Sequence, residues 1–239
     1  MEKRQEALNL IKDSQKITFL TGAGVSVASG IPDYRSMTGV YAGIDAPEYL
    51  LSHSCLQEEP EKFYRFVKEL YHPQAKGNII HQTMARLEKE KATVKIVTQN
   101  IDQLHHQVGS QKVMNFHGSL YDCYCQKCGE TVAVEAYLQS MTHQKCGGMI
   151  RPNVVLYEEG LAEEVISQSI KAVAEAELIV IVGTSLKVYP FASLIDYRRG
   201  DSQVIVINQE ELLLNEEIIM IQEDATTFFA DINERNEEK

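Results

Sequence analysis

The chain has 239 residues, of which 44% are hydrophobic and 24% charged, as in soluble globular proteins and unlike disordered or fibrous chains. Its 23 Lys and Arg against 34 Asp and Glu give a net charge of −11, which disfavours nucleic acid as a partner because the sequence has no concentrated basic patch. The longest apolar run, residues 178–182, is far shorter than the roughly 20 residues that cross a bilayer, so we expect no membrane partner. Charged residues interrupt the N-terminal segment where a signal peptide needs an apolar core, so we expect a cytoplasmic protein.

Four short runs of β-branched and other apolar residues are each followed by turn or polar residues. They cover residues 17–20, 94–98, 178–182 and 204–207, and they precede TGAG, QNID, GTS and Asn208 respectively. Runs of this length and composition predict buried parallel strands.

Three stretches between these runs have apolar residues at three- and four-residue spacing, which predicts helices over residues 2–13, 79–90 and 163–175. Strands that alternate with helices predict an α/β fold with a Rossmann-like, doubly wound parallel sheet. Ligands of such sheets bind beyond the carboxyl ends of the strands. The four segments that follow the strands should therefore meet in one crevice.

Two stretches do not fit the alternation and are predicted to form an inserted, smaller lobe. Residues 36–77 are rich in aromatic and charged residues with helical spacing, and residues 121–153 hold four of the five cysteines. We therefore predict a Rossmann-like domain from residues 1–35, 78–120 and 154–239, and a small domain with a helical part (36–77) and a metal-binding part (121–153).

The segment TGAG places Gly22 and Gly24 at a predicted strand-to-helix turn, where backbone N–H groups can approach a phosphate. The full G-x-G-x-x-G fingerprint needs a third glycine where this chain has Val27. On these residues alone, a dinucleotide-binding loop and a plain tight turn both remain open.

Six segments, in this order, resemble the sirtuin family, the NAD-dependent protein lysine deacylases. They are GAGVSVASGIPDYRS, TQNIDQLH, FHGS, a Cys-x-x-Cys pair, GGMIRPNVVLY and GTSLKVYP, and the resemblance covers roughly residues 17–208. It implies an NAD-dependent deacetylase that transfers the acyl group of acyl-lysine to ADP-ribose with release of nicotinamide. It also implies NAD and one zinc ion as cofactors and acetylated proteins or peptides as partners, and we expect a monomer.

The resemblance assigns the NAD site to three groups of residues and to His117. The first group surrounds the glycine turn: Gly22, Ala23, Gly24, Val27, Asp33, Tyr34 and Arg35. The second, expected to hold the nicotinamide end and the ribose, is Gln99, Asn100, Ile101 and Asp102. The third is Gly183, Thr184, Ser185, Asn208 and Asp224. An extended substrate peptide is expected to pair, as an added strand, with Val154, Val155, Leu156 and Tyr157.

The implied catalytic residues are His117, as the base, and Asn100. The reaction needs a ribose hydroxyl deprotonated near neutral pH, which suits an imidazole, whose free pKa is about 6.5. We expect His105 to orient its loop, and we expect surface or capping roles for four others, His53, His72, His81 and His106.

Cys125 and Cys128 form one x-x-spaced pair, and His143 and Cys146 form another, the typical spacing of a zinc ribbon. By the resemblance, His143 takes the place of the family's third cysteine. Cys123 remains an alternative fourth ligand, because residues two apart on an extended chain point to the same face. With four protein ligands the site is closed, so we expect the metal to be structural.

The chain departs from the family at three positions: Gln103 and Glu158 replace usual glycines, and Val27 replaces a small or polar residue. In residues 60–70, expected beside the acyl pocket, it offers Val67 and Leu70 where members that hold acidic acyl groups carry a Tyr-x-x-Arg pair. We therefore expect a preference for acetyl and longer apolar acyl groups.

Three other functions compete with this interpretation. An NAD(P)-dependent oxidoreductase is disfavoured by the incomplete glycine fingerprint and by the set of Asn100, Asp102 and His117. A non-catalytic zinc- and NAD-binding interaction module is disfavoured by the full set of crevice residues. Mono-ADP-ribosyl transfer on the same fold is the third alternative.

Overall fold

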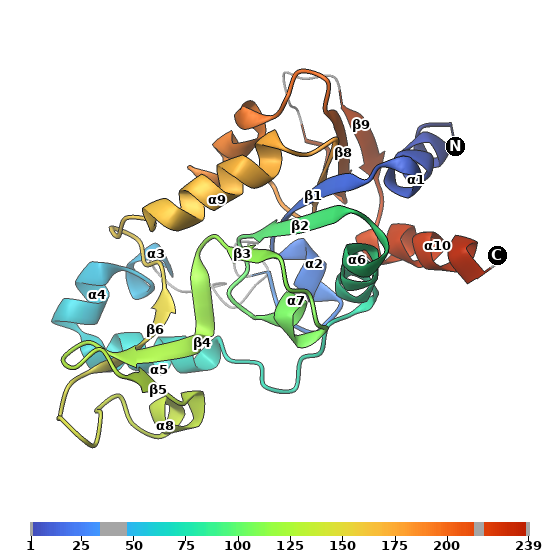
Figure 1. Ribbon diagram of the computed structural model, residues 1–239. Helices are drawn as coiled ribbons and strands as arrows, with labels where there is room; N and C mark the ends of the chain where they lie inside the picture. The colour runs from blue at the N-terminus through green and yellow to red at the C-terminus, as the bar shows by residue number, and fades with distance from the viewer. Residues whose placement is uncertain (1, 34–46, 213–217, 238–239) are drawn as a thin grey trace.

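The computed structural model describes residues 2–33, 47–212 and 218–237, and its main element is a parallel sheet of six strands (Figure 1). The strand order β3-β2-β1-β7-β8-β9 is that of a Rossmann-type sheet, so the predicted fold class is confirmed. The strands are β1 Lys16–Thr21, β2 Thr93–Thr98, β3 Val113–Asn115, β7 Leu178–Val182, β8 Gln203–Asn208 and β9 Ile219–Gln222.

Helices cover both faces of this sheet, which explains why the central strands are apolar along their whole length. In β7, Leu178 and Val180 pack into the core on one face, whereas Ile179 and Ile181 pack into the core on the other. The first face carries α1 (Glu2–Asp13), α6 (Ile79–Glu90) and α10 (Ala225–Glu237); the second carries α9 (Glu163–Ala174) and the 3-10 helix Phe191–Tyr197 (Figure 1).

The helices form where the apolar spacing predicts them. Ala7, Leu8 and Ile11 of α1 lie on one buried stripe, and α6 begins after Asn78, whose side chain accepts a hydrogen bond from the N–H of Ile80 at 2.9 Å. Helices α1 and α6 have the predicted bounds, and α9 ends one residue earlier than predicted.

A second, antiparallel sheet lies at the end of the molecule opposite to α1 and α10 (Figure 1). Its order is β5-β4-β6, with β4 Gly118–Cys125, β5 Thr131–Val132 and β6 Ile150–Val154. The short helices α3 Pro47–Leu50, α4 His53–Glu58, α5 Pro60–Glu69 and α8 Val134–Gln139 accompany it.

This second sheet has its own apolar core, to which Phe63 and Phe66 of α5 and Tyr137 of α8 contribute. A separate core is what a smaller lobe requires. The predicted division at residues 36–77 and 121–153 stays a prediction, and both β4 and β6 run across its boundaries.

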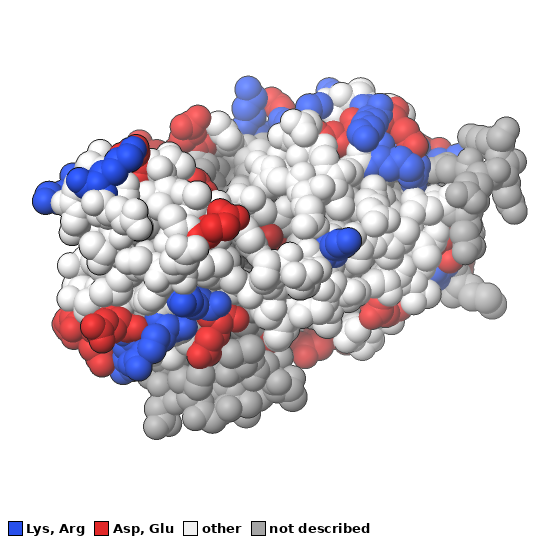
Figure 2. Space-filling model, turned by 90° about the horizontal axis from the view of Figure 1, so that it is seen from below, with Lys and Arg blue, Asp and Glu red and all other residues white. Residues whose placement is uncertain are grey.

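In the described part of the chain, no helix is long and apolar enough to cross a membrane. Figure 2 shows one face, on which acidic and basic side chains lie beside each other toward both ends and the middle is largely uncharged. Among the described residues on that face there is no broad basic area. That the protein does not bind nucleic acid stays a prediction.

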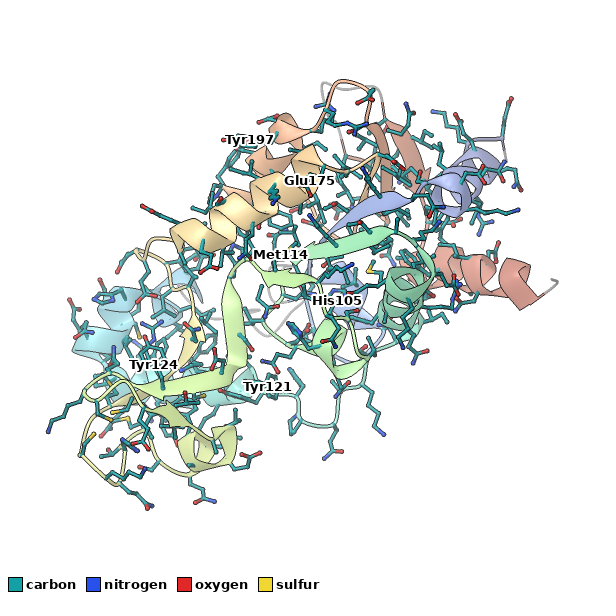
Figure 3. The ribbon with its side chains drawn as sticks, viewed as in Figure 1. His105, Met114, Tyr121, Tyr124, Glu175 and Tyr197 are labelled. Atoms are coloured by element: carbon teal, nitrogen blue, oxygen red, sulfur yellow. The ribbon has the colours of Figure 1, made fainter. Side chains whose placement is uncertain are left out.

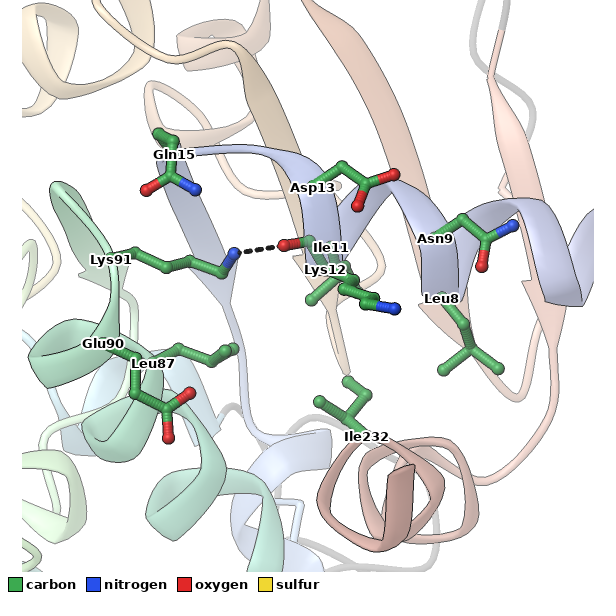
Figure 4. Close-up of a pocket in the computed structure, with 10 residues that line it drawn as sticks. All are labelled: Leu8, Asn9, Ile11, Lys12, Asp13, Gln15, Leu87, Glu90, Lys91 and Ile232. Carbon is green, nitrogen blue, oxygen red and sulfur yellow. Dashed lines mark hydrogen bonds between the residues drawn. The ribbon is translucent and has the colours of Figure 1, made fainter. Parts of the chain in front are cut away.

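A pocket of about 490 Å³ opens between the C-terminal ends of α1 and α6 and the side of α10 (Figure 4). Lys91 reaches into it, and its Nζ donates to the carbonyl oxygens of Lys12 and Ser14, each at 2.8 Å. Because the last carbonyls of a helix lack intrahelical partners, Lys91 caps the end of α1. None of the predicted site residues lines this pocket.

Candidate active site

Two glycine turns, one after β1 and one after β7, are locked against each other. The N–H of Gly24 donates to the carbonyl oxygen of Gly183 at 2.9 Å. A Cβ on Gly22 would lie 2.6 Å from Cβ of Thr184, and one on Gly24 would lie 2.7 Å from Cα of Gly183. Gly183 itself has a φ of 59°, which glycine adopts without steric cost. These glycines are therefore required by the packing of the two turns.

The turn after β1 leads directly into α2 (Gly24–Val27), which begins at the edge of the crevice. Gly22 is buried, whereas Gly24 is exposed and the side chain of Val27 is 52% exposed. The backbone at the start of α2 is thus open to a ligand while the turn behind it is closed.

A third segment, after β2, joins the two turns through side-chain hydrogen bonds. Gln99 Nε2 donates to Oγ1 of Thr184 at 2.7 Å, and Asn100 Nδ2 donates to the carbonyl oxygen of Gly22 at 3.0 Å. Gln99 and Asn100 are both buried. Three predicted groups of site residues therefore meet at one place on the sheet edge.

Ser26 links Asn100 to Asp102, and the sequence analysis missed it. Its hydroxyl accepts from Asn100 Nδ2 at 3.0 Å and donates to Oδ2 of Asp102 at 2.6 Å. Burial raises the pKa of the Asp102 carboxyl, although the Ser26 hydroxyl and the N–H of Leu104 oppose this by stabilising the charged form. The only signal in the sequence is a polar residue placed between two valines at the start of α2.

The segment continues into α7 (Leu104–Gln107). Oδ1 of Asp102 accepts a hydrogen bond from the N–H of Leu104, the first residue of this helix, at 2.9 Å. Between them Gln103 has a φ of 59°. This left-handed backbone conformation explains why the family usually has glycine at this position. A residue with a side chain adopts it at a cost of about 1 kcal/mol or more.

His117 lies in the connection between β3 and β4, partly exposed, with its ring edge-to-face on Phe116. Its Nδ1 is 3.2 Å from the carbonyl oxygen of Gln99. Because a carbonyl only accepts, Nδ1 must carry the hydrogen of the neutral ring, which places the lone pair on Nε2. The carbonyl oxygen of His117 accepts from the N–H of Val155 at 3.0 Å, so the candidate base is fixed to the predicted substrate segment.

The predicted substrate segment, residues 154–157, is held at both ends. Val154 ends β6 opposite Gly118 of β4. At the other end the N–H of Tyr157 donates to the carbonyl oxygen of Leu51, and the N–H of His53 donates to that of Tyr157, each at 3.0 Å. Tyr157 is 49% exposed. The segment thus bridges the second sheet and α4 with one side chain directed to solvent.

The remaining predicted residues lie farther along the same sheet edge or outside the described residues. Asn208 ends β8, and its Nδ2 donates to the carbonyl oxygen of Glu210 at 2.9 Å. Asp224, exposed after β9, accepts from the N–H of Thr226 at 2.8 Å. Ala23, Ser185, Ile101 and Asp33 are partly buried. Tyr34 and Arg35 lie outside the described residues.

A pair of buried histidines lies directly behind the site. Nε2 of His105, labelled in Figure 3, is 3.2 Å from Oγ1 of Thr21. The ring centroids of His105 and of His81, which belongs to α6, are 4.7 Å apart. His81 is fully buried, so the expected surface or capping role is wrong. Neither ring nitrogen of His81 has a hydrogen-bond partner among the described residues. Burial lowers the pKa of His81 to about 4 and lowers that of His105 too.

This pair predicts an acid-sensitive fold. As pH falls from about 6.5 to about 4, the unfolded chain takes up a proton that folded His81 does not, and the free energy of unfolding decreases by up to about 3 kcal/mol. Above pH 6.5, His81 is neutral in both the folded and the unfolded chain, so it does not change the free energy of unfolding with pH. In urea titrations between pH 7 and 4.5, His81→Leu should lose stability less steeply than the wild type. The exposed His106→Leu variant should follow the wild type, and equal slopes for all three proteins would contradict the prediction.

The two x-x-spaced pairs converge into one cluster. One ligand atom from each of Cys125, Cys128, His143 and Cys146 lies within 4.8 Å of the others. Sγ of Cys125 is 3.4 Å from Sγ of Cys146, and His143 Nδ1 is 3.4 Å from Sγ of Cys128. Tetrahedral zinc with bonds of about 2.0–2.3 Å holds ligand atoms about 3.5–3.8 Å apart, so the donor set fits zinc.

The alternative ligand, Cys123, lies outside this cluster. It is buried in the core of the second sheet, with its Sγ 3.6 Å from the Tyr71 hydroxyl and 3.6 Å from the carbonyl oxygen of Leu120. Burial opposes ionisation of Cys125, but backbone N–H groups of Cys128 and Lys127 lower the pKa of its thiol to about 6. Since zinc binds the thiolate, the cluster that contains His143 is the better metal site.

Comparison with known proteins yields one family. Residues 22–190 match the Sir2 family. The NAD-dependent protein deacetylase of Enterococcus faecalis is 57% identical, with 95% of each chain covered, and that of Listeria monocytogenes serotype 4b is 56% identical, with 97% of this chain and 100% of the relative covered. A Sir2 chain solved with a deacetylated p53 peptide and 3′-O-acetyl-ADP-ribose has a TM-score of 0.86, 32% identity and 97% coverage of both chains.

Proposed function

This chain belongs to the Sir2 family, and we propose that it is an NAD-dependent protein lysine deacetylase that acts on acyl-lysine peptides and proteins. When bound, NAD supplies the ADP-ribose that accepts the acyl group as nicotinamide leaves. The protein's own residues bind and orient the two substrates and transfer the proton.

The sheet edge between β1 and β7 fits a dinucleotide. The exposed backbone at the start of α2 lets a phosphate approach this helix end, and the locked turns behind it leave no room for side chains. Asn100 and Asp102, fixed by Ser26, present polar atoms in a buried setting. Preorganised groups of this kind hold a ribose and a leaving group in one orientation and exclude water.

The contacts of His117 support the proposal that it is the general base. The hydrogen bond to Gln99 holds its ring in the tautomer that accepts a proton at Nε2. Its backbone is bonded to Val155, so a peptide aligned along residues 154–157 has its acyl-lysine next to the base.

The cysteine and histidine cluster would hold one zinc ion at the end of β4, whereas His117 precedes the start of that strand. Its four protein ligands leave no open position, which is typical of structural zinc. Bound there, the ion cross-links the end of β4 to the segment before β6.

The observation that carries the proposal is that His117 bonds both the NAD-side segment, through Gln99, and the substrate segment, through Val155. Mass spectrometry of the protein incubated with NAD and an acetyl-lysine peptide tests it. Deacetylated peptide, free nicotinamide and acetylated ADP-ribose should form in equal amounts. An ADP-ribosylated peptide would indicate ADP-ribosyl transfer, and NADH would indicate an oxidoreductase.

The buried face of α5 predicts the acyl preference. Phe63, Phe66 and Val67 of this face, followed by Leu70, belong to the apolar core that also contacts Ile101 and Leu156. A succinyl carboxylate placed there loses its hydration without gaining a cation, which costs several kcal/mol. On matched peptides, kcat/KM should be at least about 100-fold higher for acetyl than for succinyl groups. Comparable values for the two acyl groups would contradict this prediction.

A further inference from the structure

Glu158 follows the substrate segment and has a backbone conformation that its residue type disfavours. Its φ is 74°, in the left-handed region that glycine adopts most readily. Its side chain is exposed to solvent, so burial does not explain the residue. The side chain of Glu158 nevertheless makes contacts that a glycine could not make.

Those contacts reach α4. Oε2 of Glu158 accepts from the backbone N–H of Ser54 at 2.9 Å and from its hydroxyl at 2.7 Å. The hydrogen bonds with Ser54 lower the pKa of the Glu158 carboxyl, as expected for donors that stabilise the charged form. Two donors on one oxygen fix the position of the side chain relative to α4.

The neighbouring residue holds the segment in a different way. Glu159 accepts from the N–H of Leu156 at 3.0 Å and pairs with buried Arg151, which in turn donates to the carbonyl oxygen of Val154 at 2.6 Å. This network also reaches α4, because Oε1 of Glu159 lies 3.2 Å from Nδ1 of His53, the first residue of that helix. Glu158 adds two further hydrogen bonds to α4, both to Ser54, beside the contact of Glu159 with His53 and the backbone bond between His53 and Tyr157.

We propose that Glu158 is a positioning residue that fastens the substrate segment to α4 before the peptide arrives, and so lowers the KM for the peptide. This inference rests on the proposed function. A segment that is already ordered loses less conformational freedom when a peptide adds a strand to it, and the peptide then binds more tightly. The residues that bind NAD and move the proton are not part of this contact.

Four variants separate the contact from the backbone conformation and from the charge. Glu158→Gly removes the contact and relaxes the backbone. Glu158→Asn tolerates the left-handed conformation but is too short to reach Ser54. Glu158→Gln keeps an oxygen that accepts from Ser54, and Ser54→Ala removes one of the two donors. Glu164→Gln, on the exposed side of α9, controls for the loss of a surface carboxylate.

Steady-state kinetics should show a rise of about three- to ten-fold in peptide KM for Glu158→Gly and Glu158→Asn, with kcat and the KM for NAD within about two-fold of the wild type. Glu158→Gln should keep most of the affinity, Ser54→Ala should lose part of it, and Ser54→Ala should add little in the Glu158→Gly background. Glu164→Gln should behave as the wild type. Melting temperatures verify that each variant folds.

Three results would overturn the proposal: an unchanged peptide KM in Glu158→Gly and Glu158→Asn, an equal loss in Glu158→Gln, or a loss seen only with peptides that carry Lys or Arg beside the acetyl-lysine. The last would mean that the carboxylate attracts a cation of the peptide. The proposed function is judged separately, by whether the wild type deacetylates the peptide at all.

Discussion

Replacing His117 with alanine should lower kcat for deacetylation by about 10²–10⁴-fold, the usual contribution of a positioned general base. The ring is bonded to the carbonyl oxygen of Gln99 and stacks edge-to-face on Phe116, so its orientation is set before any substrate binds. The contact to Val155 uses the backbone of His117, and the substitution leaves it in place. Folding and the binding of NAD and peptide should therefore change little.

Single-turnover kinetics, calorimetric titration with NAD and thermal melting together measure these three properties. His106→Ala is the matched control, since His106 is an exposed histidine on neighbouring α7. The role assigned to His117 is wrong if the alanine variant retains near-normal turnover with an unchanged pH profile. A variant that loses NAD affinity in proportion to turnover would indicate a binding role instead.

Of the substitutions considered, His143→Ala should reduce the stability of the fold the most. Structural zinc contributes about 10–16 kcal/mol of apparent binding free energy in small zinc-binding peptides, and much of that is folding free energy. His143→Ala removes one of four ligands whose atoms lie within 4.8 Å. We expect loss of the metal, a much lower melting temperature for the second sheet, and loss of activity as a consequence.

Metal analysis of purified protein by mass spectrometry gives the zinc content per chain. Cys123→Ala is the matched control, because this buried thiol contacts Tyr71 and lies outside the cluster. It should keep one zinc ion. Zinc retained in His143→Ala and lost in Cys123→Ala would make Cys123 the fourth ligand. A protein that is folded and active without zinc would contradict the structural role itself.

The central strands could be predicted because helices cover them on both sides. Strands β1, β2, β7 and β8 need apolar side chains on both faces, which produces continuous β-branched runs in the sequence. The edge strands β3 and β9 each pair with one neighbour, span three and four residues, and are too short to show a period.

Helix α10 and the buried His81 were missed for a different reason: the polar residue types outweighed the spacing. In α10, Ala225, Phe228, Phe229 and Ile232 recur at the three- and four-residue intervals of a core-facing stripe, although the end of the chain is highly charged. His81 lies three residues before Met84, on the buried face of α6. In both cases the periodicity contained the correct answer.

The candidate site was accessible mainly through the resemblance to a family. Ser26 contacts Asn100 and Asp102, which lie 74 and 76 positions further along the sequence, and no local sequence pattern predicts such contacts. The departures Gln103 and Glu158 could be recognised as unusual in the sequence, but only the left-handed backbone at both positions explains why glycine is expected there.

The interlocked turns after β1 and β7 have a consequence for how this protein can change over generations. A side chain added at Gly22 or Gly24 needs space that Thr184 and Gly183 occupy, and one added at Gly183 would meet the backbone N of Val25 at 2.6 Å. A substitution in one turn therefore requires a compensating substitution in the other, although the two turns are about 160 residues apart in the sequence. An engineer who wishes to reshape the nucleotide crevice has to exchange both turns together, or move to the α2 side, where Val27 is exposed and the constraint is absent.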